Sequence, residues 1–205
     1  MTWKNGEYQP QQKRADVKKQ KLIDAAAALF GEVGYHGTNA KAIAARAGVA
    51  TGSFYRYFRD KKALFMAVCY RNEEEIGQRI FRYADDMRRK GMDEPAILKE
   101  LVVFSIEAHH RHPALHREIL AMEIRDTDVA AWSRERESRI VEALYRFLSL
   151  RRSDYRISDL EAAAELIFYV IEEVAHRSVL FESPVGEERL TNQLTDMLNR
   201  YLFEI

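Results

Sequence analysis

Several features that would define other classes of protein are scarce in this sequence. Among 205 residues there are one cysteine, four prolines and nine glycines. A single thiol, that of Cys69, cannot form a disulfide within the chain, which favours a compartment that keeps thiols reduced. No apolar run is long enough to cross a bilayer, and no charged-then-apolar leader begins the chain. We therefore expect a cytoplasmic protein that does not bind a membrane.

The sequence also lacks the alternating runs of β-branched residues that are typical of strands. Its long segments without proline or glycine are rich in Ala, Leu, Glu and Arg, which are good helix formers. A chain of this length can bury a hydrophobic core without disulfides. We therefore predict an all-α fold.

The formal net charge is zero, but the charges are divided unevenly along the chain. Residues 1–62 hold 12 Lys and Arg against 5 Asp and Glu, whereas residues 63–205 hold 20 against 27. Counterion release rewards positive charge only where a nucleic acid duplex lies. The division favours a phosphate-binding head joined to a domain that does not touch nucleic acid. An uneven but merely solvated surface is the alternative that charge alone leaves open.

The segment 39–58, NAKAIAARAGVATGSFYRYF, has the length and punctuation of a helix-turn-helix DNA reader. Asn39 can cap a first short helix, and Gly48 can end that helix at a positive φ. In a second short helix Phe54 and Phe58 point inward because they lie four residues apart. Small hydroxyls, a glycine and two phenols remain outside, where they suit close approach to phosphates and base edges. These outward residues are Thr51, Gly52, Ser53, Tyr55 and Tyr57.

The motifs around this segment are specific in type and order. They are Gly34-Tyr35-His36-Gly37-Thr38, Ile43-Ala44, Ala47-Gly48-Val49, Tyr55-Arg56-Tyr57-Phe58, Lys61 and Leu64. With them, the segment from Val17 to Val68 resembles the N-terminal pattern of the tetracycline-repressor (TetR) family of bacterial transcription regulators. Beyond this quarter of the chain the resemblance depends on length and helical content alone.

The resemblance implies a set of DNA contacts. Lys41 lies where a basic residue can reach a base edge, and Lys61 begins a helix whose positive dipole end favours a phosphate. The expected DNA-binding residues are Thr38, Lys41, Thr51, Gly52, Ser53, Tyr55, Tyr57 and Lys61. The alternatives are an ordinary surface role for Lys41 and partial core packing for Tyr55. Arg56 is a weaker candidate that could simply be solvated.

The chain is expected to have three parts. Residues 1–15 are polar and predict a flexible basic arm. Residues 16–62 form the helix-turn-helix DNA-binding domain, and residues 63–205 form an effector-binding and dimerisation domain. Asp60 can cap a fourth helix that leaves the first domain and enters the second. That helix is the expected mechanical link between them.

Two C-terminal helices are too apolar to be covered on one side only. Ser158 and Glu161 predict a capping box for a long helix that reaches about Phe181, and Gly186 precedes the last helix. Apolar residues around most of a helix imply burial on two sides, one of which a second copy of the chain can cover. The predicted homodimer contacts are Leu166, Phe168, Val170, Ile171, Val174, Leu194, Met197, Leu198 and Tyr201.

The resemblance further implies a small-molecule effector pocket in the second domain. Aromatic and polarizable side chains among the middle helices are the candidates for its wall. They are Phe104, Met122, Trp132, Tyr145, Tyr169 and His176. Each could instead be ordinary core. If they do line a pocket, its ligand is largely apolar or aromatic.

Neither a metal site nor a catalytic site is expected. His112 and His116 have the spacing of metal ligands on a helix, but Pro113 between them interrupts the shared face. Cys69 lies in an apolar segment and is interpreted as a small buried hydrophobe rather than a redox sensor. Gly-rich phosphate loops, paired catalytic carboxylates and nucleophile elbows do not stand out. We expect no enzyme activity and no cofactor.

Together these features predict a ligand-responsive transcriptional repressor. It would bind a palindromic operator on double-stranded DNA as a homodimer and be released by a small hydrophobic effector. A DNA-binding regulator controlled by a protein partner, or acting as an activator, is the alternative. A non-specific architectural DNA protein is a third possibility, which the acidic second domain argues against.

Overall fold

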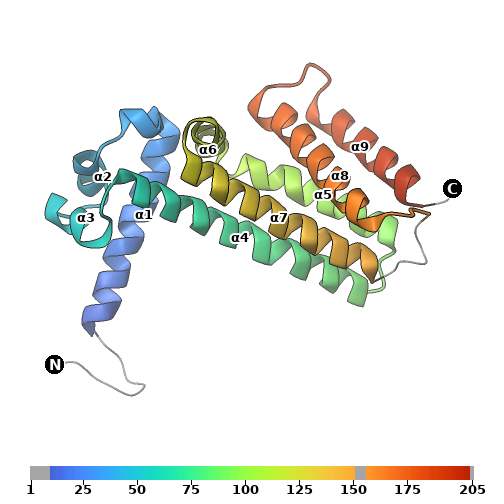
Figure 1. Ribbon diagram of the computed structural model, residues 1–205, viewed down its shortest axis with the longest axis horizontal. Coiled ribbons are helices and arrows are strands. Elements are labelled where there is room, and N and C mark those ends of the chain that lie inside the picture. Colours follow the sequence, from blue (N-terminus) through green and yellow to red (C-terminus); the bar gives the residue numbers. More distant parts are fainter. Residues whose placement is uncertain (1–9, 151–155, 204–205) are drawn as a thin grey trace. The chain divides into compact units, whose positions relative to one another are not determined.

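The computed structural model describes the backbone of residues 10–150 and 156–203, and their side chains outside 10–14 and 74–82 (Figure 1). The described residues contain no β-strand, which confirms the predicted all-α fold. The α-helices are α1 Pro10–Gly37, α2 Ala40–Arg46, α3 Thr51–Tyr57, α4 Lys61–Arg89, α5 Glu94–His110, α6 Pro113–Arg125, α7 Thr127–Ser149, α8 Leu160–Ala175 and α9 Glu187–Leu202. A π-helix, η2 His176–Leu180, continues α8.

Short polar side chains begin several of these helices, as the sequence predicts. The Ala42 amide donates to Oδ1 of Asn39 at 2.9 Å, and the Ala63 amide donates to Oδ1 of Asp60 at 2.7 Å. Each carboxylate or amide oxygen satisfies a backbone donor that the first turn of a helix leaves open. The capping side chains of Asn39 and Asp60 therefore set where α2 and α4 begin.

Two helix starts differ from the prediction. Helix α1 begins at Pro10, so residues 10–15 of the expected arm are helical, because proline is well tolerated in a first helical turn. The rest of that arm lies outside the described residues. Asp159, rather than Ser158, caps α8, because its Oδ1 accepts the Ala162 amide at 3.0 Å. The predicted capping box is therefore wrong by one residue.

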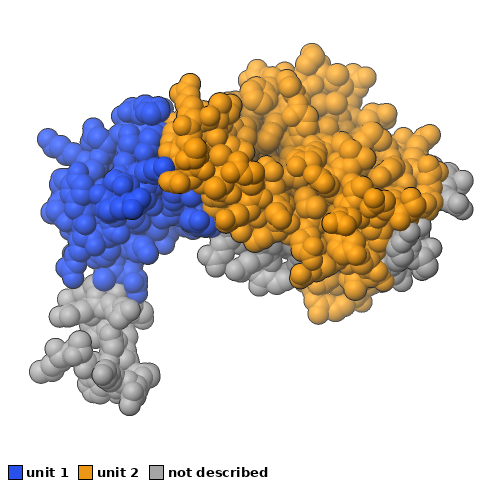
Figure 2. Space-filling view, in the orientation of Figure 1, with its two compact units in different colours: residues 1–72 blue, residues 73–205 orange. Residues whose placement is uncertain are grey.

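The chain divides into two compact units, residues 1–72 and 73–205 (Figure 2). The division falls inside α4, whereas the sequence-based boundary lay at 62/63, so this helix belongs to both units. In the first unit, edge-to-face packing places the ring centroids of Phe30 and Phe65 5.2 Å apart. Cys69 is fully buried there. The largest buried side chains of this core are Leu22, Phe30, Ile43, Phe54, Leu64, Phe65 and Val68.

The second unit is a bundle in which α5 and α8 make the central contacts (Figure 1). Helix α8 also packs on α7, and α9 packs on α5 and α8. The Arg156 amide donates to the Leu202 carbonyl at 3.1 Å, so the chain enters α8 beside the end of α9 and the two helices run antiparallel. The core includes Ile97, Val102, Leu148, Ile167, Leu198 and Leu202. No helix in the described part of the chain has the length and apolarity needed to cross a membrane.

Candidate nucleic-acid interface

A tight turn sets the angle between α2 and α3. Gly48 has φ +66°, a left-handed conformation that a residue with a Cβ adopts only with strain. The Val49 amide donates to the Ala44 carbonyl at 3.0 Å, and the Gly48 amide donates to the Ala45 carbonyl at 3.1 Å. This pair of bonds is a Schellman motif, which satisfies the open carbonyls at the end of α2. The sequence-based prediction that Gly48 ends this helix is confirmed.

Helix α3 buries one face and exposes the other. Phe54 and Phe58 are buried, as their spacing predicts. Tyr55 is 61% exposed although its ring lies 5.1 Å from that of Phe54, so partial core packing does not remove it from the surface. Thr51, Gly52 and Arg56 are exposed, and Ser53 and Tyr57 are half-buried. Lys41 on the adjoining helix α2 is also exposed.

Gly52 has no role in packing within the chain. A Cβ built on this residue would meet no heavy atom within 4 Å, and its φ is not positive. Neither steric crowding nor backbone conformation therefore requires glycine here. The bare backbone at the start of α3 is free for close approach by another molecule.

Thr38 does not belong to the exposed surface, contrary to its predicted role as a phosphate ligand. The residue is 3% exposed, and its hydroxyl donates to the Gly34 carbonyl at 2.8 Å. Gly34 breaks α1 with φ 76° and ψ 167°, which leaves carbonyls near the kink that need donors. Thr38 supplies one of them. We therefore remove it from the candidate DNA contacts.

Lys61 has a structural role that its position at the start of α4 did not predict. Its Nζ donates to the carbonyls of Tyr35 at 2.6 Å and Thr38 at 2.7 Å, and it lies 4.2 Å from the centroid of the Tyr35 ring. These contacts attach α4 to the turn after α1. Two of the three N–H donors of this ammonium are directed at carbonyls of the chain, so we no longer propose Lys61 as a phosphate contact.

An ion pair joins α1 to α2. Arg46 donates through Nη1 and Nη2 to the two carboxylate oxygens of Glu32, at 2.8 and 2.6 Å. This hydrogen-bonded guanidinium lowers the pKa of the Glu32 carboxyl. The pair is exposed, so its main effect is on the orientation of α2 rather than on stability.

The predicted effector residues do not share one environment in the second unit. Met122 and Trp132 are buried, and the indole Nε1 of Trp132 donates to Oε2 of Glu73 at 3.2 Å. Tyr145 and Tyr169 are exposed instead. Amphipathic helices place such rings on either face, and the sequence does not show which face a neighbour covers.

The two remaining candidates for the effector site have other neighbours. Phe104 is half-buried beside Tyr83, with ring centroids 6.0 Å apart. His176 lies in a group of histidines in η2 and the adjoining helices. The structure therefore does not bring the six predicted residues together around one cavity that it describes.

The predicted dimer contacts separate into two groups. Phe168, Ile171, Leu194 and Leu198 are buried within the chain, so their assignment to an interface was wrong. Leu166 and Met197 are about half exposed, and Val170, Val174 and Tyr201 are half-buried. Phe181 and Val185, which the predicted set did not include, are also exposed.

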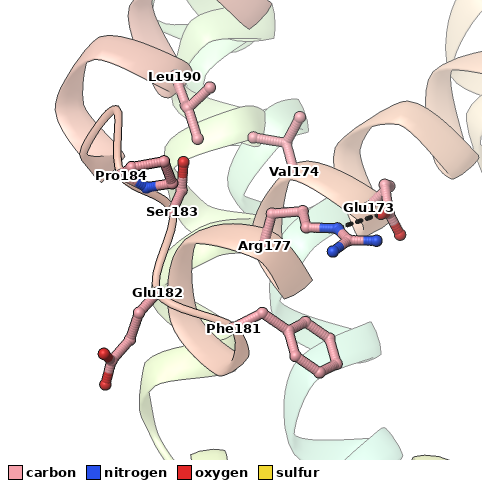
Figure 3. A pocket seen from close by; sticks show the side chains of 8 residues that line it. All are labelled: Glu173, Val174, Arg177, Phe181, Glu182, Ser183, Pro184 and Leu190. Atoms are coloured by element: carbon pink, nitrogen blue, oxygen red, sulfur yellow. Dashed lines mark hydrogen bonds and ion pairs between the residues drawn. The ribbon is translucent and has the colours of Figure 1, made fainter.

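A shallow cavity of about 260 Å³ lies where η2 turns toward α9 (Figure 3). Its apolar wall includes Val174, Phe181 and Leu190. Arg177 donates to Oε1 of Glu173 at 2.7 Å and lies over the Phe181 ring, so its guanidinium is held at the rim. None of the six predicted effector residues lines this cavity.

A helix-turn-helix unit with a polar recognition surface, joined to a separate helical unit, defines a DNA-binding regulator. Two family descriptions match the chain: "Bacterial regulatory proteins, tetR family" over residues 22–68, and "Tetracyclin repressor-like, C-terminal domain" over residues 95–202. The second covers more than half of the chain. The protein therefore belongs to the TetR family of bacterial transcriptional regulators, and the resemblance seen in the sequence is confirmed.

Similar proteins agree with this assignment. The fatty acid metabolism regulator protein of Bacillus subtilis (strain 168) is 26% identical over 199 residues, covering 91% of this chain and 96% of that relative. Among solved structures, a TetR-family transcriptional regulator from Mesorhizobium loti has a TM-score of 0.75 at 21% identity and covers 93% of this chain and 99% of its own. The fatty acid degradation regulator FadR from Bacillus halodurans has a TM-score of 0.68 at 23% identity, covering 94% and 96%. All three are named as regulators, and the two solved structures share the fold of this chain.

Proposed function

We propose that this regulator represses transcription by binding a palindromic operator as a homodimer, and that a small apolar molecule releases it. The observation that carries the proposal is the exposed face of α3. It combines hydroxyls, a bare glycine and a phenol, next to Lys41 of α2. Thr51, Gly52 and Tyr55 of this face are exposed, and its hydroxyls can donate to phosphates and approach base edges.

The proposed DNA contacts follow from exposure on α2 and α3. Lys41 reads a base edge, and Tyr55 and Tyr57 contact phosphates. Thr51, Gly52 and Ser53 lie in the first turn of α3, where hydroxyls and backbone amides can meet both phosphates and bases. Arg56 joins the set as a phosphate contact because it is exposed on the same short helix.

The proposed dimer interface consists of apolar stripes on α8 and α9. Leu166, Val170 and Val174 follow one another at intervals of four residues and so lie on one face of α8. Met197 and Tyr201 form the matching stripe on α9. Exposed apolar patches on soluble proteins commonly mark such interfaces. Two helices from each subunit would then form a four-helix interface around a two-fold axis.

This interface also accounts for the cavity near η2. Val174 lines the cavity and belongs to the α8 stripe, and Leu190 lies seven residues before Met197 on α9. The volume of about 260 Å³ is smaller than the range of roughly 300–1,000 Å³ that is usual for ligand pockets. We assign the cavity to the surface that the second subunit covers, not to the effector.

The effector is proposed to bind in the second unit, with Met122 and Trp132 as its buried apolar candidates. The name of the Bacillus subtilis relative makes compounds with a fatty acyl chain the first ones to test. Helix α4 provides the covalent connection because it begins beside the DNA-binding helices and continues past the boundary at 72/73. An effector that favours a different position of α4 would lower operator affinity by its coupling free energy, about 1–3 kcal/mol or roughly 5- to 150-fold.

A binding assay tests the first part of this proposal. The full-length protein is titrated at one fixed salt concentration against a fragment of its own upstream region and against a random duplex of equal length. We expect at least about 10³-fold tighter binding to the cognate fragment. Footprinting should show two inverted half-sites about 34–36 Å apart, or a multiple of that distance. Equal affinity for both duplexes would instead indicate an architectural DNA protein.

The effector is tested by reciprocity. Fatty acids and acyl thioesters of graded chain length are screened by thermal shift, and each hit is titrated into free protein and into the operator complex. Thermodynamic linkage requires operator DNA to weaken effector binding by the same factor as the effector weakens DNA binding. A compound whose affinity does not change with operator DNA is not the inducer.

A further inference from the structure

Three histidines from distant parts of the sequence meet inside the second unit. His109 lies near the end of α5, His116 in the first turns of α6 and His176 at the start of η2. Their ring centroids are 4.6 Å apart for His109 and His116, 5.2 Å for His109 and His176, and 5.1 Å for His116 and His176. One ligand nitrogen from each ring lies within 4.8 Å of the other two. The group is not the His112 and His116 pair considered from spacing.

The contacts of these rings place Nε2 atoms close together inside the second unit. Nδ1 of His109 lies 2.8 Å from the Ser105 carbonyl, so it carries the proton, and Nε2 is left with its lone pair. That Nε2 is buried and has no hydrogen-bond partner in the structure. The Nε2 atoms of His116 and His176 are 3.0 Å apart. A buried acceptor without a donor is costly, which points to a missing electrophile at this position.

We propose that His109, His116 and His176 bind a divalent transition-metal ion through their Nε2 atoms, with zinc as the preferred ion. Imidazole nitrogens suit zinc, copper, iron and nickel, and three histidines are an established ligand set for zinc. Tetrahedral zinc with Zn–N bonds of about 2.0–2.1 Å holds its ligand nitrogens about 3.3 Å apart. The Nε2 separation of 3.0 Å between His116 and His176 is already close to this spacing.

The surroundings of the three rings have features of a metal site. The bond from His109 Nδ1 to the Ser105 carbonyl is the type of outer contact that fixes the tautomer and orientation of a ligating histidine. Metal ligation requires a neutral imidazole with a free lone pair, and this bond leaves Nε2 of His109 as the nitrogen that can ligate.

A carboxylate borders the same space. Glu172 on α8 places Oε1 3.8 Å from Nε2 of His109 and Oε2 3.9 Å from Nε2 of His176. Arg136 of α7 donates to Oε2 at 3.3 Å, which positions the carboxylate. The carboxylate offsets the positive charge of Arg136 and would offset that of the metal, and it lies beside two of the three proposed ligands. The site would join α5, α6 and the α8–η2 segment, so metal binding should restrain these elements relative to one another.

Metal binding to the untagged full-length protein tests this proposal. The assay contains no DNA, so a failure of the metal proposal can be distinguished from a failure of the proposed repressor function. Protein stripped with a chelator is titrated with Zn²⁺ against a chromophoric competitor. We expect one tight site per chain. His116→Gln and His176→Gln should weaken it by at least the 10- to 100-fold that is typical for loss of an outer-shell partner. His112→Gln, at an exposed histidine outside the cluster, is the matched control and should bind like the wild type.

Two results would overturn the proposal: wild-type protein that binds Zn²⁺ no more tightly than the double variant His116→Gln/His176→Gln, or a His112→Gln variant that loses as much affinity. X-ray absorption of the zinc-loaded wild type provides a readout that does not depend on variants folding. Three imidazole nitrogens at about 2.0–2.1 Å are expected. A zinc shell with fewer than three imidazoles would place the metal elsewhere on the protein.

Discussion

Replacing Gly52 by alanine should raise the free energy of unfolding of the protein and weaken its binding to the operator. The added methyl group meets no atom of the chain within 4 Å, and the backbone is already helical, so it introduces no strain. Alanine in a helix is favoured over glycine by about 0.5–1 kcal/mol because it loses less backbone entropy on folding. The position near the start of a seven-residue helix places the gain at the lower end of this range.

The effect on DNA binding has the opposite sign if the α3 backbone approaches the duplex closely. A methyl group between them would lengthen the contacts of the first turn. A loss comparable to that of one good base contact, about 1–3 kcal/mol, corresponds to roughly 5- to 150-fold weaker binding to the cognate operator. Gly52→Ser, with a larger side chain, should weaken binding further. The graded series distinguishes steric exclusion from a change in helix stability.

Two measurements on the same preparations decide the matter. Thermal unfolding should show Gly52→Ala melting at or slightly above the wild type, by about 1–2 °C for a stabilisation of about 0.5 kcal/mol in a chain of this size. Fluorescence anisotropy with labelled operator, at fixed salt, should show the loss of affinity. Wild-type affinity in the Gly52→Ala variant would refute close backbone approach. A lower melting temperature would show that the added methyl group does collide with other atoms of the chain.

Four further substitutions test the other assignments. Lys61→Met should destabilise the protein by about 1–3 kcal/mol in urea, because two carbonyls lose a charged donor; unchanged stability would return Lys61 to the DNA contacts. Thr38→Val should cost about 0.5–1.5 kcal/mol of stability and, once folded, bind operator like the wild type. Lys41→Ala should weaken cognate binding by about 1–3 kcal/mol and random DNA by less, and equal losses would exclude base reading. Met197→Glu should yield folded monomers by sedimentation, whereas the α9 control Asn192→Glu should behave as the wild type does.

The DNA-binding helices could be predicted from sequence because their determinants are close together in the chain. The cap at Asn39 acts across three residues, and the turn at Gly48 depends on bonds that span three to five residues. Phe54 and Phe58 share a face because they lie four residues apart. Such short-range geometry is set by the backbone itself, and the fold of the rest of the molecule changes it little.

Prediction of individual sites failed where a contact spans a long stretch of chain. The ammonium of Lys61 donates to the carbonyls of Thr38 and Tyr35, which lie 23 and 26 residues earlier in the chain. These hydrogen bonds become visible only in the folded first unit. In the same way Phe168 and Leu194 carry no local sign of which apolar face their own subunit covers. A helix pattern identifies the apolar side chains, but the neighbour that buries each one is decided by packing.

The all-α fold, the helix-turn-helix and the family could be predicted without a structure, because helix propensity, caps and motif spacing are local properties. The burial of Thr38, and the distance of 3.0 Å between Nε2 atoms of His116 and His176, 60 residues apart, follow from packing alone. The spacing of histidines along one helix, interrupted at Pro113, argued against a metal site. Packing of α5, α6 and η2 brings together ligands that no periodicity connects, because contacts between elements depend on the arrangement of the whole unit.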